Sequence, residues 1–158
     1  MFRNLHSNLR FTLALVKFMI NPFSKSFTRE NSKWNSNWSN FRVIARGTVP
    51  ISYLKVTVLG LGKVPIEKSP HFNFVSSNHQ STDYQDYIIE YYSECNVKKQ
   101  MQHFVSLYNK MKFYNSDSTI LVRQSTLFSN ELIVLDGVHR LAILAALGNK
   151  IISVKISF

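Results

Sequence analysis

The segment at residues 131–158 constrains the fold more than any other part of this chain. It reads ELIVLDGVHRLAILAALGNKIISVKISF. Residues 131–135 form a short apolar run with the length and the β-branched content of a strand. The dense apolar run at 138–147 predicts a helix that ends at Gly148, and residues 151–158 predict another strand. The segment therefore predicts a strand, a turn, a helix and a strand, in that order.

Polar residues gather where this helix is expected to begin, in the run Asp136, Gly137, Val138, His139 and Arg140. A helix N-terminus exposes unpaired N–H groups and the positive end of the helix dipole, so it binds anions readily. Gly137 lets the backbone approach a ligand closely, and Arg140 can contact two phosphate oxygens at once. His139 adds a hydrogen-bond donor or a group that shuttles a proton. The cluster predicts a phosphate-binding site.

Asp136 does not suit a phosphate directly, because two anions repel each other. Three roles for it stay open. It caps the helix by accepting N–H bonds from Val138 or His139, it binds Mg²⁺ that bridges to phosphate oxygens, or it takes a proton from a substrate hydroxyl. Asp136 is therefore a candidate metal ligand and a candidate catalytic residue.

Periodic patterns predict the other elements of the domain. Residues 84–92 place tyrosines and an isoleucine at helical spacing, and residues 97–114 predict a second amphipathic helix. We interpret the tyrosine stripe as core or groove wall, and His103, within the second helix, as structural. Strands are expected at 42–45, 53–59 and 118–124. These elements predict the α+β class, with a small mixed β-sheet and helices packed on it.

The stretch at 63–71, KVPIEKSPH, has the composition of a loop stiffened by two prolines. It carries Glu67, Ser69 and His71. Polar groups on such a loop either line a site or form an ordinary solvated surface, and both interpretations stay open.

The N-terminal part of the chain differs from the rest. Residues 1–21 predict an amphipathic basic helix, which packs on the domain, lies on a membrane surface or acts as a targeting segment. Residues 22–40 are rich in Asn and Ser and predict a linker. Within it, Trp34 and Trp38 are spaced to share a helix face and to anchor the linker to the domain or to lipid headgroups. The globular domain is expected at 41–158.

The chain has a formal net charge of +10, from 19 Lys and Arg against 9 Asp and Glu in 158 residues. This charge favours nucleic acid, an anionic membrane surface or phosphorylated metabolites as partners, and a generally basic surface without such a partner is the alternative. The single cysteine, Cys95, excludes an intrachain disulfide and a Cys-rich zinc site. We expect a cytoplasmic protein, with peripheral membrane contact through residues 1–21 as the open alternative.

The run DGVHR, followed by a helix and a strand, resembles the end of the ParB/sulfiredoxin-like superfamily domains. The resemblance is sharp over 131–158 and looser back to Val49, where VPISYLKV resembles the opening strand of those domains. Val138 stands where sulfiredoxins carry their catalytic cysteine, which argues against sulfinic-acid reduction. Chromosome-partitioning ParB proteins have a Gly-Glu-Arg-Arg type loop that binds CTP, and His139 departs from it.

The free-serine-kinase branch is closest in motif, because it carries a D-G-x-H-R loop that binds nucleotide phosphates. The resemblance implies that residues 136–140 bind ATP or ADP, or else CTP, together with Mg²⁺. It implies an earlier acid that activates the acceptor, for which Glu67 is the candidate, and Ser69 and His71 nearby are candidates for substrate or phosphate contact. The implied function is a small-molecule kinase or nucleotide hydrolase with a small hydroxyl-bearing acceptor. The alternative is a non-catalytic ParB-like module that binds nucleic acid or a membrane.

Overall fold

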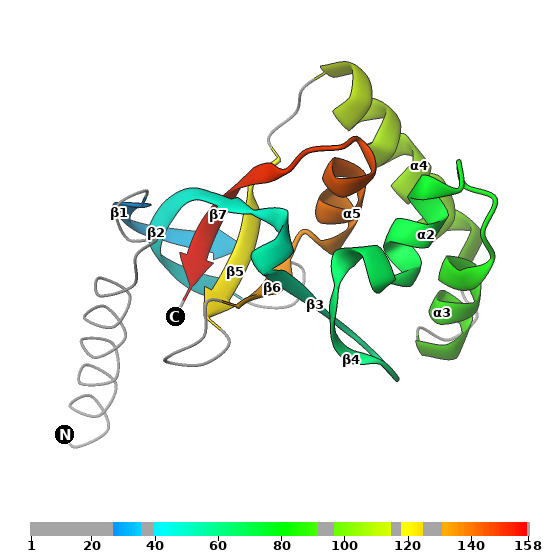
Figure 1. Ribbon diagram of the computed structural model, residues 1–158, viewed down its shortest axis with the longest axis horizontal. Helices are drawn as coiled ribbons and strands as arrows, with labels where there is room; N and C mark the ends of the chain where they lie inside the picture. Colours follow the sequence, from blue (N-terminus) through cyan, green and yellow to red (C-terminus); the bar gives the residue numbers. More distant parts are fainter. Residues whose placement is uncertain (1–26, 36–39, 92–96, 115–117, 125–130, 158) are drawn as a thin grey trace.

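The computed structural model describes residues 27–35, 40–91, 97–114, 118–124 and 131–157 (Figure 1). These residues form a mixed α+β domain, so the predicted fold class is confirmed. The strands are β1 (Phe27–Asn35), β2 (Asn40–Pro50), β3 (Leu54–Val58), β4 (Gly62–Pro65), β5 (Ile120–Gln124), β6 (Leu132–Asp136) and β7 (Ile151–Ser157). The α-helices are α2 (Pro70–Ser76), α3 (Asp83–Tyr91), α4 (Val97–Tyr114) and α5 (Val138–Ala146), and the short 3-10 helices are η2 (Ile51–Tyr53) and η3 (Ile66–Lys68).

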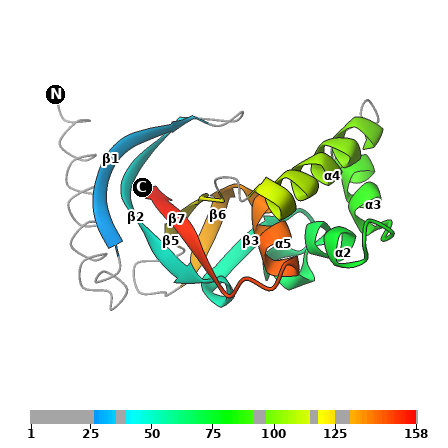
Figure 2. The ribbon, with the colours of Figure 1, turned by 90° about the horizontal axis from the view of Figure 1, so that it is seen from above.

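The strands form one seven-stranded sheet with the order β1-β2-β7-β5-β6-β3-β4. Two of its strand pairs, β3 with β6 and β5 with β7, run parallel, and the other pairs are antiparallel. The predicted mixed sheet is therefore confirmed. Helices α2 to α5 gather on one side of the domain, while the long curved strands β1 and β2 lie on the other (Figures 1 and 2).

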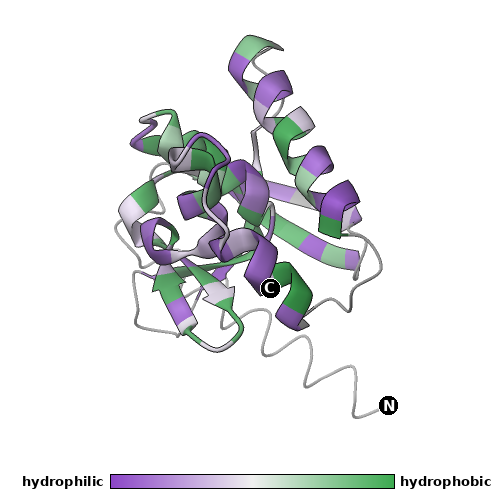
Figure 3. Ribbon diagram, turned by 90° about the vertical axis from the view of Figure 1, so that its right-hand side faces the viewer, coloured by the Kyte–Doolittle hydropathy of each residue, from purple (hydrophilic) through white to green (hydrophobic). Residues whose placement is uncertain are grey.

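The core lies where the middle of the sheet meets α5. Ile120, Leu121 and Val122 of β5 are fully buried, as expected for a strand that is covered on both faces. Leu141 and Ile143 of α5 are also fully buried, and α5 packs against α2 and α4. Hydrophobic and hydrophilic positions alternate along α4 (Figure 3), because it buries one face, whereas α5 buries four consecutive residues from Leu141 to Leu144. This packing fixes α5, and with it the start of the helix where a phosphate site is predicted.

The predicted loop at 63–71 is wrong in large part, because it contains most of β4, all of η3 and the start of α2. Ser69 precedes α2, and its hydroxyl oxygen accepts the backbone N–H of Phe72 at 3.2 Å. Pro70 occupies the first position of the helix, where its missing N–H costs nothing. A serine cap and a proline thus start a short helix in a stretch whose composition indicates a loop.

The linker predicted at 22–40 is also wrong in part, because strand β1 occupies Phe27–Asn35. Composition alone predicts disorder here, but pairing with β2 satisfies the backbone of β1 from Phe27 opposite Gly47 to Asn35 opposite Asn40. Trp34 lies on a strand and not on a helix. Its indole contacts the domain, as one of the two predicted anchoring modes requires.

Three further predictions concern residues outside the described ranges: the amphipathic helix at 1–21, the second anchor Trp38 and the thiol Cys95. Within the part of the chain that the structure describes, no helix is long and apolar enough to cross a membrane.

Candidate functional site

The junction of β6 and α5 opens into a pocket of about 720 Å³. Strand β6 ends at Asp136, Gly137 adopts a left-handed conformation with φ 95°, and α5 begins at Val138. Residues of α2, α3 and α4 complete the pocket, which brings together the sequence-predicted residues Asp136, Gly137, Val138, His139, Arg140 and His71. Six of the predicted site residues therefore share one cavity.

Asp136 is held by two partners from different elements. Its Oδ2 accepts the indole N–H of Trp34 at 2.8 Å and lies 3.8 Å from a guanidinium nitrogen of Arg140. The Arg140 guanidinium also lies over the Trp34 ring, 5.5 Å from the ring centroid. Among the described residues, the carboxylate bonds these groups and not the helix N–H groups of Val138 or His139. The Asp136 side chain therefore does not cap helix α5.

Gly137 is favoured by its left-handed backbone angle and lies close to two neighbouring side chains. A Cβ at this position would lie 3.0 Å from Ile120 Cδ1 and 3.1 Å from a guanidinium nitrogen of Arg140. The Gly137 carbonyl accepts the N–H of Leu141 at 2.8 Å, which is the first hydrogen bond of α5. The absence of a Cβ at Gly137 thus leaves room for the Arg140 side chain, which folds back from α5 against the turn that precedes this helix.

His139 faces the interior of the domain. Its Nε2 is hydrogen-bonded to the Tyr84 hydroxyl at 2.6 Å, and its ring lies edge-on to Phe104 with centroids 4.5 Å apart. Burial is the largest of the causes that together lower the pKa of His139 to about 4; nearby His103 and Arg140 add to the shift, and Asp136 opposes it. The imidazole is therefore neutral near pH 7. A neutral imidazole can form hydrogen bonds, but it carries no positive charge that would pair with a phosphate.

His71 lies behind His139 in the same pocket, with the two ring centroids 5.1 Å apart. It is only 7% exposed, and its Nδ1 has no hydrogen-bond partner among the described residues. Burial, with a smaller contribution from His139, lowers the pKa of His71 to about 3. A neutral ring with its proton on Nε2 leaves a bare acceptor at Nδ1, which costs less than a buried unpaired N–H.

The other two predicted residues are placed differently. The Ser69 side chain is fully buried, and its hydroxyl donates to the Ile66 carbonyl at 2.7 Å. It holds the start of α2 and is not among the described residues that line the pocket. Glu67 is exposed on η3 and does not line the pocket within the described part of the chain either. The structure brings neither residue to the Asp136 cluster.

Several pocket residues were not predicted as site residues. Lys99 and His103 of α4 line the pocket and are exposed. The structural interpretation of His103 stays a prediction. Tyr84 and Tyr87 belong to the predicted tyrosine stripe, which serves as a wall of the pocket as well as core. The i, i+4 spacing of Lys99 and His103 places them on one side of α4, but no local pattern shows which neighbour that side meets.

The pocket does not fit a protein-built magnesium site. In the ranges that the structure describes, no three His, Cys, Asp or Glu side chains are grouped to hold a metal ion. Asp136 is the carboxylate of the pocket, and its Oδ2 is engaged by Trp34 and Arg140. Mg²⁺ usually keeps several waters and is held by one or two carboxylates together with substrate phosphates, so Asp136 would supply a single protein ligand to an ion that a nucleotide brings.

Comparisons with protein-family models, curated proteins and solved structures found no match to this chain. The resemblance to the ParB/sulfiredoxin-like superfamily therefore remains an expectation, and it rests on the run from Asp136 to Arg140 and the elements around it.

Proposed function

We propose that this chain is a nucleotide-binding domain of the ParB/sulfiredoxin-like type, which transfers or hydrolyses a nucleotide phosphate with a small hydroxyl-bearing acceptor. One observation carries the binding part of the proposal: the pocket joins the start of α5 to the cationic side chains of Arg140 and Lys99. The transfer part comes from the resemblance in the DGVHR run. The two parts are tested separately.

The charges of the pocket favour an anion. Arg140 has five N–H donors in a planar fork, more than its pairing with Asp136 uses. Lys99 adds a mobile ammonium group from α4, and the start of α5 adds backbone N–H groups. A phosphate in this position would meet these donors together.

The walls of the pocket favour a ligand larger than inorganic phosphate. Tyr87 and Leu107 line it together with the buried rings of His71 and Tyr84. An aromatic and apolar wall beside a cationic group suits a ligand with a ring and a phosphate, and a nucleotide has both. The neutral imidazole of His139 can bond an uncharged group of such a ligand.

Calorimetric titration with ATP, ADP and CTP, each with and without Mg²⁺, tests the binding part. We expect Arg140→Ala to abolish binding, because it removes the planar fork. Lys99→Ala should weaken binding by about tenfold, which corresponds to about 1.4 kcal/mol. Lys98→Ala is the matched control, because Lys98 is also exposed on α4 but does not line this pocket.

Two results would remove the binding proposal. One is the absence of binding by the wild-type chain at millimolar nucleotide. The other is an equal loss in Lys98→Ala and Lys99→Ala, because the general positive charge would then explain the affinity.

The transfer part is tested by release of labelled terminal phosphate, alone and with free serine or another small alcohol. Asp136→Asn keeps an acceptor for the Trp34 N–H and removes the charge that a base needs. We expect this variant to bind nucleotide and to lose transfer. If the wild-type chain binds nucleotide but neither releases nor transfers phosphate, the domain binds without catalysis.

A second candidate function is non-catalytic contact with nucleic acid or an anionic membrane. It is favoured by the net charge of +10 and by the exposed lysines Lys98, Lys99, Lys110 and Lys112 on α4. Gel shifts at low and high salt test nucleic acid, because counterion release makes such binding fall steeply with salt. Vesicle sedimentation of the full chain and of a variant without residues 1–21 tests the membrane.

A further inference from the structure

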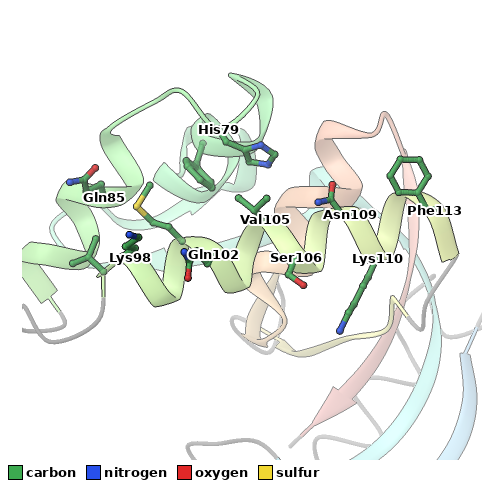
Figure 4. Close-up of a pocket in the computed structure, with 12 residues that line it drawn as sticks. His79, Gln85, Lys98, Gln102, Val105, Ser106, Asn109, Lys110 and Phe113 are labelled. Carbon is green, nitrogen blue, oxygen red and sulfur yellow. The ribbon is translucent and has the colours of Figure 1, made fainter.

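A second cavity, which we call the α4 groove, has a volume of about 1090 Å³. One wall is the length of α4 from Val97 to Phe113. The other wall consists of Phe74 of α2, His79 of the following turn and Gln85 of α3, and His79 lies across from Val105 in Figure 4. None of the described residues 136–140 lines this groove, so it is distinct from the candidate nucleotide pocket.

The α4 groove is elongated. Its lining residues on α4 recur every four positions, in one row through Val97, Met101 and Val105 and in a neighbouring row of more polar residues. Rows of side chains four residues apart form the ridges and grooves by which helices pack on each other. An 18-residue helix is about 27 Å long. This shape suits a partner helix of several turns better than a compact ligand.

The floor of the groove is apolar and is incompletely covered. Phe74 is buried at its base, while Met101 and Val105 are half-buried. Phe113 is 70% exposed at the far end, the largest exposed fraction among the large hydrophobic side chains described. Methionine adapts its shape to irregular apolar partners. The groove therefore offers a row of apolar contacts that an amphipathic helix could bury.

The charge of the groove restricts what fills it. Among the described residues that line it there is no Asp or Glu, whereas Lys98 and Lys110 are both lining and exposed. The Lys110 ammonium points away from His79 in Figure 4, but a four-carbon stem lets it turn toward a bound partner. An acidic occupant is complementary to these groups.

The N-terminal segment of this chain does not have the charge of such an occupant. Its segment at 1–21 contains no Asp or Glu and carries Arg3, Arg10 and Lys17. A second copy placed face to face would bring the same lysines opposite each other, and like charges disfavour that contact.

We propose that the α4 groove binds an amphipathic helix of another protein, with one apolar stripe flanked by Asp or Glu. The apolar stripe would cover Met101, Val105 and Phe113, and the acidic flanks would meet Lys98 and Lys110. This site is separate from the proposed nucleotide function and does not depend on it.

Selection from a library of displayed helical peptides against the full chain tests the proposal. We expect enrichment of peptides with apolar residues at three- and four-residue spacing and with acids beside them. The enriched peptides should lose at least about tenfold in affinity with Phe113→Asp. Leu61→Asp, at an apolar side chain that is 59% exposed in the β3–β4 turn, should leave their affinity unchanged.

Charge reversal separates specific contact from general attraction. Lys98→Glu with Lys110→Glu changes the net charge as much as Lys63→Glu with Lys68→Glu, at lysines that are exposed and outside the groove. We expect only the first pair to lose more than about tenfold in peptide affinity.

Three kinds of result overturn the proposal. The first is a peptide test without specificity, which means no enrichment of acidic amphipathic peptides or equal losses in both charge-reversal pairs. The second is self-association of the wild-type chain that Phe113→Asp abolishes, which would make a second copy the occupant. The third is an oligonucleotide whose binding depends on Lys98 and Lys110 but not on Lys63 and Lys68, which would assign the groove to nucleic acid.

Discussion

At the scale of single residues, Gly137 is the position where the turn, the helix start and the Arg140 side chain meet. Its φ of 95° is costly for any residue with a Cβ, and a Cβ would also press on Ile120 and on Arg140. We expect Gly137→Ala to lower the free energy of unfolding and to weaken nucleotide binding by displacing the guanidinium. Urea denaturation and nucleotide titration measure the two effects.

Gly148→Ala is the matched control for Gly137→Ala. Gly148 has a similar φ of 81°, but nothing lies within 4 Å of the position where its Cβ would be. Both variants place a residue with a Cβ at a positive φ, so both lose stability through the backbone. The free energy of unfolding of Gly137→Ala should be lower than that of Gly148→Ala by a further amount of about 1 kcal/mol or more, which is the lower end of the range for an overpacked site. Equal losses would mean that the contacts with Ile120 and Arg140 are unimportant.

The buried histidines make a second residue-scale prediction, which concerns pH. The folded-state pKa values of His71 and His139, about 3 and about 4, lie below the ordinary value of 6.5. At pH values between the folded-state pKa values and 6.5, the unfolded chain binds more protons than the folded chain. The free energy of unfolding therefore rises with pH in this range. The stabilising contribution is therefore present above about pH 6.5 and is lost progressively as the pH falls toward about 4.

Urea denaturation between about pH 7 and about pH 4.5 measures this loss in the wild type and in His71→Phe. A phenylalanine keeps a ring among Tyr84, Tyr87 and Phe104 and removes a buried nitrogen that has no partner in the described structure. We expect His71→Phe to match or exceed the wild type near pH 7 and to have a flatter pH dependence. An unchanged slope would contradict burial of neutral His71.

At the scale of elements, β1 completes the candidate site from outside the predicted domain. Its Trp34 donates to Asp136 and lies beneath Arg140, while Lys155 of β7 lies 5.7 Å from the same ring centroid. Trp34→Phe keeps an aromatic ring and removes the N–H donor. We expect a loss of about 1.5 kcal/mol in the free energy of unfolding, because hydrogen bonds to charged groups are the stronger ones.

A double-mutant cycle of Trp34→Phe with Asp136→Ala isolates this contact. Denaturation of the wild type, both single variants and the double variant should give a coupling energy of at least about 1 kcal/mol. Effects that add to within about 0.5 kcal/mol would show that the hydrogen bond contributes little.

The helices of this domain could be predicted where their period is strong. Val97–Tyr114 was predicted with its observed bounds, and α5 to within one residue, because each has a long apolar face and a clear end. The short helix α2 was missed although Ser69-Pro70 is a recognisable cap and first-turn pair. Strand β1 could not be predicted from its composition, because its order depends on pairing with β2, a contact that no local pattern encodes.

The candidate site was predicted mainly where it is continuous in sequence, and His71, predicted from the stretch at 63–71, is the exception. Asp136 to Arg140 were predicted together because a turn and a helix start join them. Trp34, Tyr84 and Lys99 reach the same place through sheet pairing and helix packing, which are non-local. Glu67 was proposed from its place in the chain alone, and the fold puts it on an exposed turn.

At the scale of the whole molecule, α4 separates two cavities of different character. Lys99, His103 and Leu107 face the candidate nucleotide pocket, while Lys98, Met101 and other residues of α4 face the groove. Neighbouring lysines thus serve different surfaces, because adjacent helix positions point about 100° apart. This geometry makes the Lys98 and Lys99 variants informative controls for each other.

The sheet as a whole predicts a gradient of local stability. Strand β5 lies at the centre of the strand order, is paired on both sides and is fully buried at Ile120, Leu121 and Val122. Strands β1 and β4 form the two edges, and β4 has only four residues, of which Gly62 and Lys63 are exposed. Opening an edge exposes little apolar surface, whereas opening β5 requires the core to come apart.

Hydrogen exchange followed by mass spectrometry measures this gradient in the full chain. We expect amides of β5 and its neighbour β7 to exchange with a free energy close to that of global unfolding, and amides of β4 to open at a cost several kcal/mol lower. Strand β1 should lie between them, because Trp34 and the ion pair between Glu30 and Lys155 attach it to the domain. Trp34→Phe should speed exchange in β1 and leave β4 unchanged. Uniform exchange across the sheet, or faster exchange in β5 than in β4, would contradict a core centred on β5 and α5.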